Sequence, residues 1–223
     1  MRIAFFLLAV SGLIFGGRFG TPVGRWFFYT AQSNLLIAVM FGFLIVRTAV
    51  DTRQNGLHGS ACYAPRFQMF ATLMVFFTLI IFWTLLAPFA KRWGYDGMWT
   101  YGNITTHFLT PMAAIVDYFL FVETGKLRKR DIALSLLFPA FTLSLAYIVG
   151  FFGLTFYFDN GVAQNFPYYF MDYRLLGWLS PLIMLVISSV YFCFAILIYR
   201  LDKRRFSKMP GKTKPAITKK THN

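Results

Sequence analysis

The chain has 223 residues, of which 57% are hydrophobic, 20% aromatic and only 13% charged, and its mean hydropathy is +0.57. A soluble domain is close to half apolar and a quarter charged, so this composition excludes a soluble globular protein and indicates an integral membrane protein. Cys62 and Cys193 form no CxxC pair and no His/Cys ligand spacing, and no phosphate- or dinucleotide-binding glycine pattern is present. We therefore expect no disulfide framework, no metal and no cofactor.

The N-terminal half of the sequence contains three apolar stretches that predict membrane-spanning helices. Residues 3–17 form the first, and two interpretations stay open for it: a cleaved secretory signal or a retained span. The link GRFGTPVGRW before the next apolar run is short, which favours a retained hairpin of two helices. The second span is predicted over 27–46 and the third over 67–90, with a loop at 47–66 between them.

The C-terminal half contains three more predicted spans, over 103–122, 132–156 and 175–199. Pro139 predicts a kink in the fifth span, because proline has no N–H to donate and its ring clashes with the preceding turn. We therefore predict an all-α fold, an integral membrane bundle of six transmembrane helices formed by residues 1–200. Residues 201–223 are expected to be a disordered basic tail, because they contain too few apolar residues to fold alone.

The distribution of Lys and Arg predicts the orientation in the membrane. The N-terminus, the 47–66 loop, the 123–131 turn and the tail together hold 17 of the 22 basic residues, and the other loops hold 5. Both termini are therefore expected on the cytoplasmic side of the plasma membrane, with Trp and Tyr residues crowding the opposite side. We interpret the basic tail as a contact with anionic inner-leaflet lipid and expect no nucleic acid, because no base-reading motif accompanies the charge.

Two ionisable side chains lie inside the fourth predicted span. His107 and Asp117 would be strongly unfavourable in hydrocarbon unless they face the bundle interior or a wet cavity, so they mark a candidate site. Asn103, His107, Thr110 and Asp117 follow one another at spacings of four, three and seven, which places them along one side of a helix.

Thr30, near the start of the second span, is predicted to lie at the same depth as His107. Each is about three residues inside its helix, hence roughly 5 Å below the outer boundary, and the two spans run in the same direction. A threonine hydroxyl becomes a useful nucleophile when a base accepts its proton. His107 is placed to do so, whereas His58 lies in a cytoplasmic loop and His222 in the tail.

Polar side chains at helical spacing accompany this pair on the same two spans: Gln32, Ser33, Asn34, Asn103, Thr106 and Thr110. Asn34, Asn103 or Gln32 could donate to the oxygen that gains charge when an ester carbonyl is attacked. A structural interpretation stays open, because such residues in membrane helices often bond to their own turn or hold neighbouring helices together.

An acidic partner for His107 is harder to assign. Asp117 lies ten residues further along the helix, about 15 Å away and beyond hydrogen-bond reach. We expect it to be protonated, paired with a cytoplasmic Arg or bonded to a hydroxyl on another span, and to be structural. Asp172, in the outer loop before the sixth span, lies at a better depth.

Three blocks of the sequence stand out together: FFYTAQSNLLIAV, HFLTPMAAIVDYFLF and NFPYYFMD. They resemble the YFTIQSNLL-type, HYVVPLLVLLDWLLF-type and YPYPFLD blocks of the Pr6Pr family of bacterial six-span membrane proteins. That family is similar to the eukaryotic androgen-induced-gene and androgen-dependent TFPI-regulating proteins, multi-span threonine hydrolases of fatty acid esters of hydroxy fatty acids. Thr30 in FYT and His107 in NITTH match their nucleophile and histidine contexts, although Ile104 stands where the eukaryotic proteins have a second His.

The residues and the resemblance together predict an intramembrane hydrolase of lipid or fatty-acid esters, with Thr30 as nucleophile and His107 as general base near the outer leaflet. Membrane lipid is the expected partner and a lipid ester the expected substrate. Two alternatives stay open: a non-catalytic membrane protein that binds or transports a lipid or small solute, and a structural membrane protein.

Overall fold

The computed structural model describes residues 1–16, 24–56, 62–90, 98–157 and 163–207, and these are mostly helical. This confirms the predicted all-α membrane bundle. The main helices are α1 (Arg2–Phe15), α2 (Tyr29–Asn55), α3 (Pro65–Ile81), α5 (Thr110–Phe121), α7 (Leu137–Phe151) and α9 (Leu179–Ser207). The shorter elements are η1 (Gly24–Phe27), η3 (Phe82–Leu86), η4 (Ala87–Phe89), α4 (Tyr101–Ile104), η6 (Thr105–Leu109), α6 (Lys129–Ser135), β1 (Phe156–Tyr157), β2 (Ala163–Gln164), η7 (Tyr169–Met171) and α8 (Tyr173–Leu176).

Among the described residues, five helical stretches are long and apolar enough to cross a membrane: Tyr29–Asn55, Pro65–Phe89, Tyr101–Phe121, Lys129–Phe151 and Leu179–Arg205. They correspond to the second to sixth predicted spans. The first predicted span is α1, a helix of 14 residues. At 1.5 Å per residue it covers about 21 Å, less than the hydrocarbon core of about 30 Å.

The predicted loop at 47–66 is wrong in its first part, because α2 continues to Asn55. The Asn55 side chain donates to Asp51 within this last stretch of the helix. The helix ends where Gly56 takes a φ of 60°, a backbone conformation that favours glycine.

The predicted tail is also helical at its start, because α9 extends to Ser207. The Asp202 carboxylate accepts hydrogen bonds from the backbone N–H groups of Gly125 and Leu127, which fixes this end of α9 to the turn before α6. Residues 208–223, the rest of the predicted tail, lie outside the described residues.

The interruption predicted from Pro139 is present as a break at Leu136 between α6 and α7. Proline cannot donate to the carbonyl of Ser135, four residues earlier. The Tyr191 hydroxyl on α9 donates to that carbonyl at 2.9 Å instead. A neighbouring span thus satisfies the backbone group that proline leaves free, as a membrane interior requires.

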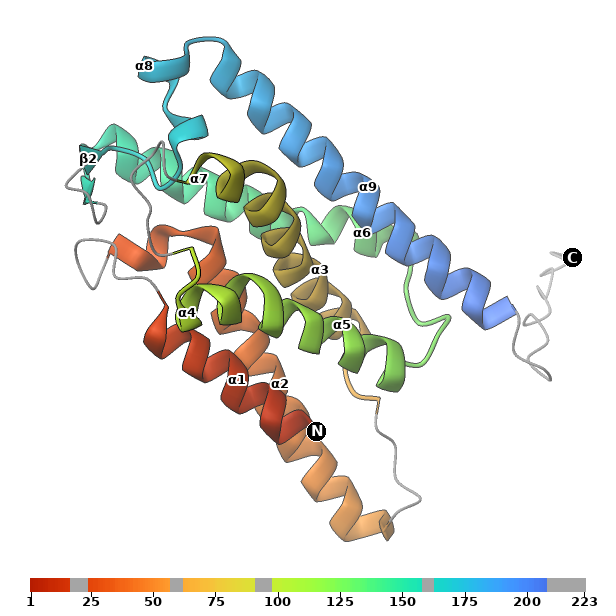
Figure 1. Ribbon diagram of the computed structural model, residues 1–223. Helices are drawn as coiled ribbons and strands as arrows, with labels where there is room; N and C mark the ends of the chain where they lie inside the picture. The colour runs from red at the N-terminus through yellow and green to blue at the C-terminus, as the bar shows by residue number, and fades with distance from the viewer. Residues whose placement is uncertain (17–23, 57–61, 91–97, 158–162, 208–223) are drawn as a thin grey trace, which may run out of the picture.

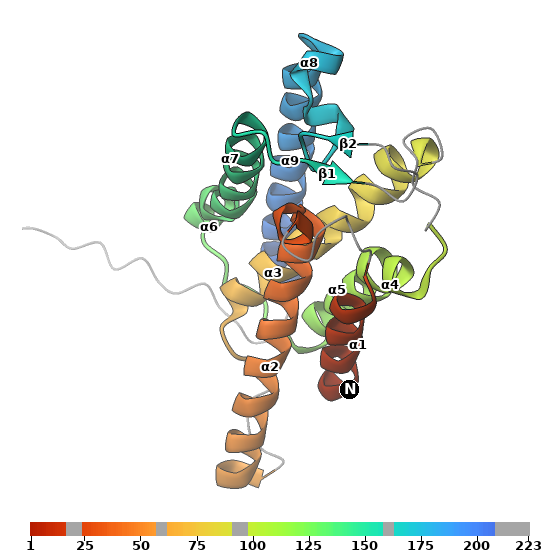
Figure 2. The same cartoon turned by 90° about the vertical axis from the view of Figure 1, so that its left-hand side faces the viewer.

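The helix α3 lies between two groups of helices (Figure 1): α1, α2 and α5 on one side, and the C-terminal helices on the other. The start of α2, the short helix α4 and the paired strands β1 and β2 lie at the left-hand end of the bundle in Figure 1, the side that faces the viewer in Figure 2. Phe156 of β1 packs edge-on against Phe28, the residue before α2. This end of the bundle holds Thr30 and His107.

The helix α1 is integrated into the bundle by a buried ion pair and by close backbone contact. The Arg2 guanidinium donates to the Asp117 carboxylate at 2.8 Å, and both side chains are buried. At its other end α1 approaches α4 so closely that a Cβ on Gly102 would lie 1.9 Å from the carbonyl oxygen of Phe15. α1 therefore packs against the rest of the bundle at both of its ends.

Candidate functional site

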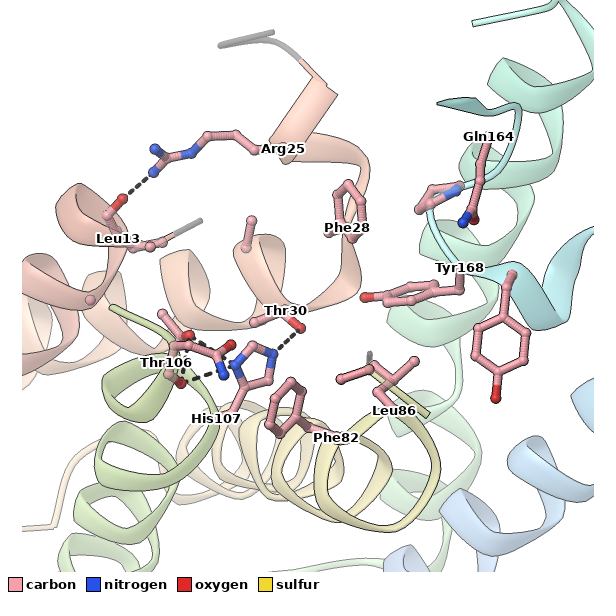
Figure 3. A pocket seen from close by; sticks show the side chains of 17 residues that line it. Leu13, Arg25, Phe28, Thr30, Phe82, Leu86, Thr106, His107, Gln164 and Tyr168 are labelled. Atoms are coloured by element: carbon pink, nitrogen blue, oxygen red, sulfur yellow. Dashed lines mark hydrogen bonds between the residues drawn. The ribbon is translucent and has the colours of Figure 1, made fainter. Parts of the chain in front are cut away.

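Thr30 and His107, predicted to lie at the same depth, are in contact. The hydroxyl oxygen of Thr30 lies 3.2 Å from Nε2 of His107 (Figure 3). Thr30 is the second residue of α2, and His107 lies in the π-helical turn η6 between α4 and α5. His107 is buried and Thr30 is half-buried.

The other ring nitrogen of His107 sets its tautomer. Nδ1 lies 3.0 Å from the backbone carbonyl oxygen of Asn103, which can only accept. Nδ1 therefore carries the proton, and the lone pair of Nε2 faces Thr30, whose hydroxyl donates to it. Thr106 Oγ1, 3.1 Å from Nδ1, donates its own proton to the carbonyl of Gly102 and can accept from the ring. The carbonyl of Asn103 thus occupies the orienting position for which Asp172 was considered.

Pro111 limits the backbone hydrogen-bond pattern around His107. In η6 the N–H of Thr110 bonds to the carbonyl of Thr105, five residues earlier, and proline at the next position has no N–H to continue this pattern. The carbonyl of Thr106 instead accepts from the side-chain amide of Asn34 at 3.1 Å. A second π-helical turn, η3, ends two residues before Pro88 in the same way.

Phe82, the first residue of η3, stacks on the His107 ring with centroids 3.9 Å apart and an angle of 29° between planes. Both π-helical turns therefore contribute to one site, and such turns are frequent at functional sites. Phe82 was not among the site residues predicted from the sequence. The sequence feature that could have pointed to Phe82 was the pair of prolines, Pro88 and Pro111, one in each of two successive predicted spans.

Three of the predicted supporting residues hold the fold and do not line the site. The Asn34 amide nitrogen donates to the carbonyls of Thr30 and Thr106, so its predicted role as oxyanion donor is wrong. Ser33 bonds to Thr78 at 2.9 Å. Gln32 donates to the Trp26 carbonyl and accepts from Thr142.

The remaining predicted residues divide between the site and its surroundings. Asn103 and Thr106 line the cavity beside His107, and Asn103 donates to the carbonyl of Met98 at 2.7 Å. Thr110 is fully buried outside the cavity, and its hydroxyl has no hydrogen-bond partner among the described residues.

The two candidate acids lie away from the reaction centre and do not line the cavities described below. Asp117 pairs with Arg2 and also accepts from Gln68 at 3.2 Å, which corresponds to the expected pairing with an Arg. Asp172 caps α8 by accepting from the N–H of Arg174. His58 and His222 lie outside the described residues, within which no three His, Cys, Asp or Glu side chains could hold a metal ion.

Two cavities meet at Thr30. The first, of about 120 Å³, is lined by His107, Asn103, Arg25 and Gln164, among others. The second, of about 320 Å³, lies between α3, α7 and α9. Four residues line both cavities: Thr30, Phe82, Leu86 and Tyr168.

Tyr168, in the segment after β2, was missed as a site residue in the sequence. Its hydroxyl points toward Thr30 (Figure 3), and its ring stacks on Phe170 with centroids 5.2 Å apart. Burial raises the pKa of Tyr168, and hydrogen bonds with the Thr30 side chain and with the backbone of Thr30 and Tyr29 lower that pKa in part. The phenol is therefore protonated at neutral pH, and its oxygen sits at the N-terminus of α2.

Scans of the chain against protein-family models, curated proteins and solved structures each returned no match. The support for a function therefore comes from the chemistry of the site.

Proposed function

We propose that the chain is an intramembrane hydrolase of lipid or fatty-acid esters, with Thr30 as nucleophile and His107 as general base. The observation that carries this proposal is the 3.2 Å contact between Thr30 Oγ1 and the unprotonated Nε2 of His107. A hydroxyl, a base and a fixed acceptor for the far side of the ring are the parts that nucleophilic ester hydrolysis needs.

The first half-reaction forms an acyl-threonine. The Thr30 oxygen attacks the ester carbonyl carbon while its proton moves to Nε2 of His107, and the carbonyl π electrons move to oxygen. When the intermediate collapses, the bond to the alcohol oxygen breaks, and that oxygen takes the proton from Nε2. In the second half-reaction water, deprotonated by Nε2, attacks the acyl-threonine and releases the acid, with the proton returned to Thr30.

The Tyr168 hydroxyl is the proposed donor for the oxygen that becomes negative. The first backbone N–H groups of a helix have no acceptor within the helix, and those of Tyr29 and Thr30 hydrogen-bond the Tyr168 oxygen. These bonds hold the hydroxyl at the start of α2, where it points toward Thr30. A donor fixed in a water-poor site stabilises developing charge strongly, and Tyr168 takes the role for which Asn34, Asn103 and Gln32 were considered.

The wider context of the proposal is the membrane. The apolar helices are those of a membrane-embedded protein. The Lys and Arg distribution favours a plasma-membrane protein with both termini in the cytoplasm and the site near the outer leaflet. The sequence resemblance to the Pr6Pr family and to the multi-span threonine hydrolases supports the same roles for Thr30 and His107.

A fluorescent alkyl phosphonate that reacts with serine and threonine nucleophiles tests the proposal on the full chain in detergent. We expect labelling of the wild type, with Thr30 as the modified residue, and no labelling of Thr30→Ala or His107→Ala. Thr84→Ala is the matched control, because Thr84 is an exposed helical threonine outside both cavities. Equal labelling of wild type and folded Thr30→Ala would contradict the proposal.

A non-catalytic lipid-binding function is the second candidate, because the two cavities that share Thr30 as a wall residue could hold a lipid without chemistry. It predicts that Thr30→Ala binds lipid as the wild type does and that neither protein reacts with the phosphonate. For the transport alternative, Asp117 is the acidic side chain in the fourth predicted span that could carry a proton, but it is fully buried and paired with Arg2.

A further inference from the structure

The two cavities share Thr30 as a wall residue and have largely different walls elsewhere. His107, Asn103, Arg25 and Gln164 line the first cavity and are absent from the walls of the second. The second cavity is formed mainly by aliphatic and aromatic side chains of α3, α7 and α9. A ligand whose reacting carbon is held at Thr30 can therefore extend into both.

The proton transfer decides which part of an ester enters which cavity. The departing alcohol oxygen must receive its proton from Nε2 of His107, so it has to leave on the side that His107 lines. That side is the first cavity, whose walls also carry a guanidinium and two amides. The acyl group then points into the second cavity, on the other side of Thr30.

The walls of the second cavity suit a hydrocarbon chain. The hydroxyls of Thr78, Thr142 and Tyr191 are bonded within the protein, to Ser33, Gln32 and the Ser135 carbonyl. These groups present mainly their carbon atoms to a ligand. The Tyr29 hydroxyl is an exception on this wall, because it has no hydrogen-bond partner among the described residues.

The second cavity reaches the surface of the bundle between α7 and α9. Ala140 on α7 and Ser188 on α9 both line it, and both are small and exposed. In a membrane-embedded helix, an exposed position at this depth faces the acyl chains of the bilayer. The opening is therefore lateral, toward lipid.

We propose that the second cavity holds the acyl chain of the ester, and that this chain enters from the bilayer between α7 and α9, past Ala140 and Ser188. The proposal rests on the proposed hydrolase function for the direction of the ester. It makes the second cavity the determinant of acyl-chain length, and the first cavity the determinant of the alcohol.

Narrowing the opening tests the proposal through substrate choice. We expect Ser188→Phe and Ala140→Phe to lower the ratio of palmitoyl to butyryl p-nitrophenyl ester hydrolysis by about tenfold or more, because a blocked apolar pocket rejects added methylenes. Ser189→Phe and Ser144→Phe are the matched controls, since both positions are exposed on the same helices and lie outside both cavities. An unchanged ratio in the first pair, with folded protein, would overturn the proposal.

A second measurement separates this proposal from the hydrolase function. The Thr30→Ala protein is incubated with a palmitoyl ester that carries a diazirine at the chain end, and labelled peptides are located by mass spectrometry after illumination. Labelling within the walls of the second cavity, lost in Ser188→Phe and kept in Ser189→Phe, supports the acyl cavity even if the wild type hydrolyses nothing. Labelling confined to the outer surface and unaffected by Ser188→Phe overturns it.

Discussion

The side-chain amide of Asn34 donates to the backbone carbonyl of Thr106 at 3.1 Å, across the interface between α2 and the π-helical turn η6. This bond joins the helix that carries Thr30 to the turn that carries His107. It uses a carbonyl that has lost its backbone donor because residue 111 is proline. The relative position of nucleophile and base therefore depends on a residue outside the cavity.

Replacing Asn34 with leucine should weaken both the fold and the site. Asn34→Leu keeps a similar volume but leaves a buried carbonyl unsatisfied, which costs about 1–3 kcal/mol of unfolding free energy. Thermal unfolding in detergent and phosphonate labelling should both decline. Asn55→Leu, at an exposed position on the same helix, should change neither. An Asn34→Leu protein as stable and as reactive as the wild type would show that the bond is dispensable.

Removing the Tyr168 hydroxyl should slow the reaction without unfolding the protein. Tyr168→Phe preserves the ring that stacks on Phe170 and packs edge-on against Phe28. Loss of one oxyanion donor lowers kcat by about 10²–10³-fold with little change in KM. Tyr173→Phe, outside both cavities, is the control. A kcat within a few-fold of the wild type would remove Tyr168 from the mechanism.

The pH dependence of ester hydrolysis should reflect a tyrosine whose pKa is raised. Burial raises the pKa of Tyr168 above its ordinary value of 10.0. The phenol proton, and with it the hydrogen bond to the developing oxyanion, is present below that raised pKa and lost as the pH rises through it. We therefore expect no decline in kcat from this group up to about pH 10. A decline below that pH that disappears in Tyr168→Phe would contradict the assignment.

The buried pair of Arg2 and Asp117 should contribute to stability and not to chemistry. Asp117→Asn leaves the buried guanidinium without its counter-charge, and breaking such a pair destabilises a protein by about 3–5 kcal/mol. The double variant Arg2→Met with Asp117→Leu should recover most of the unfolding temperature and keep phosphonate labelling, because neither residue lines a cavity. If the stable double variant loses labelling, Asp117 has a role in the reaction.

The close approach of α1 to α4 should make Gly102 intolerant of a side chain. A Cβ there would lie 1.9 Å from the Phe15 carbonyl oxygen, so Gly102→Ala must push α1 away from the cavity that its residues Gly12 and Leu13 help to line. Overpacking of this kind destabilises by about 1–3 kcal/mol, and labelling should decline with it. Gly42→Ala is the matched control, because its Cβ meets only the Phe6 ring at 3.5 Å. Equal stability of the two variants would contradict this packing.

The sequence by itself determined the class of fold and the central pair of residues. Apolar stretches of span length can bury their backbone polar groups only as helices in a membrane, so the helical class of the fold follows from composition. The expectation that Thr30 and His107 share one depth followed from helix rise and from the distribution of basic residues, because both quantities depend on distance along the chain alone.

Only the tertiary structure decided which side chains surround that pair. Helical spacing shows which residues share a face but not which face meets which, so Phe82 and Tyr168, from an adjacent span and a distant loop, could not be placed. The same limit explains why Asn34 was one of three candidate oxyanion donors, whereas its amide donates to two backbone carbonyls. Contacts between helices are set by the packing of whole helix surfaces. The π-helical turns that carry His107 and Phe82 each precede a proline, and the local effect of that proline depends on the neighbouring helix.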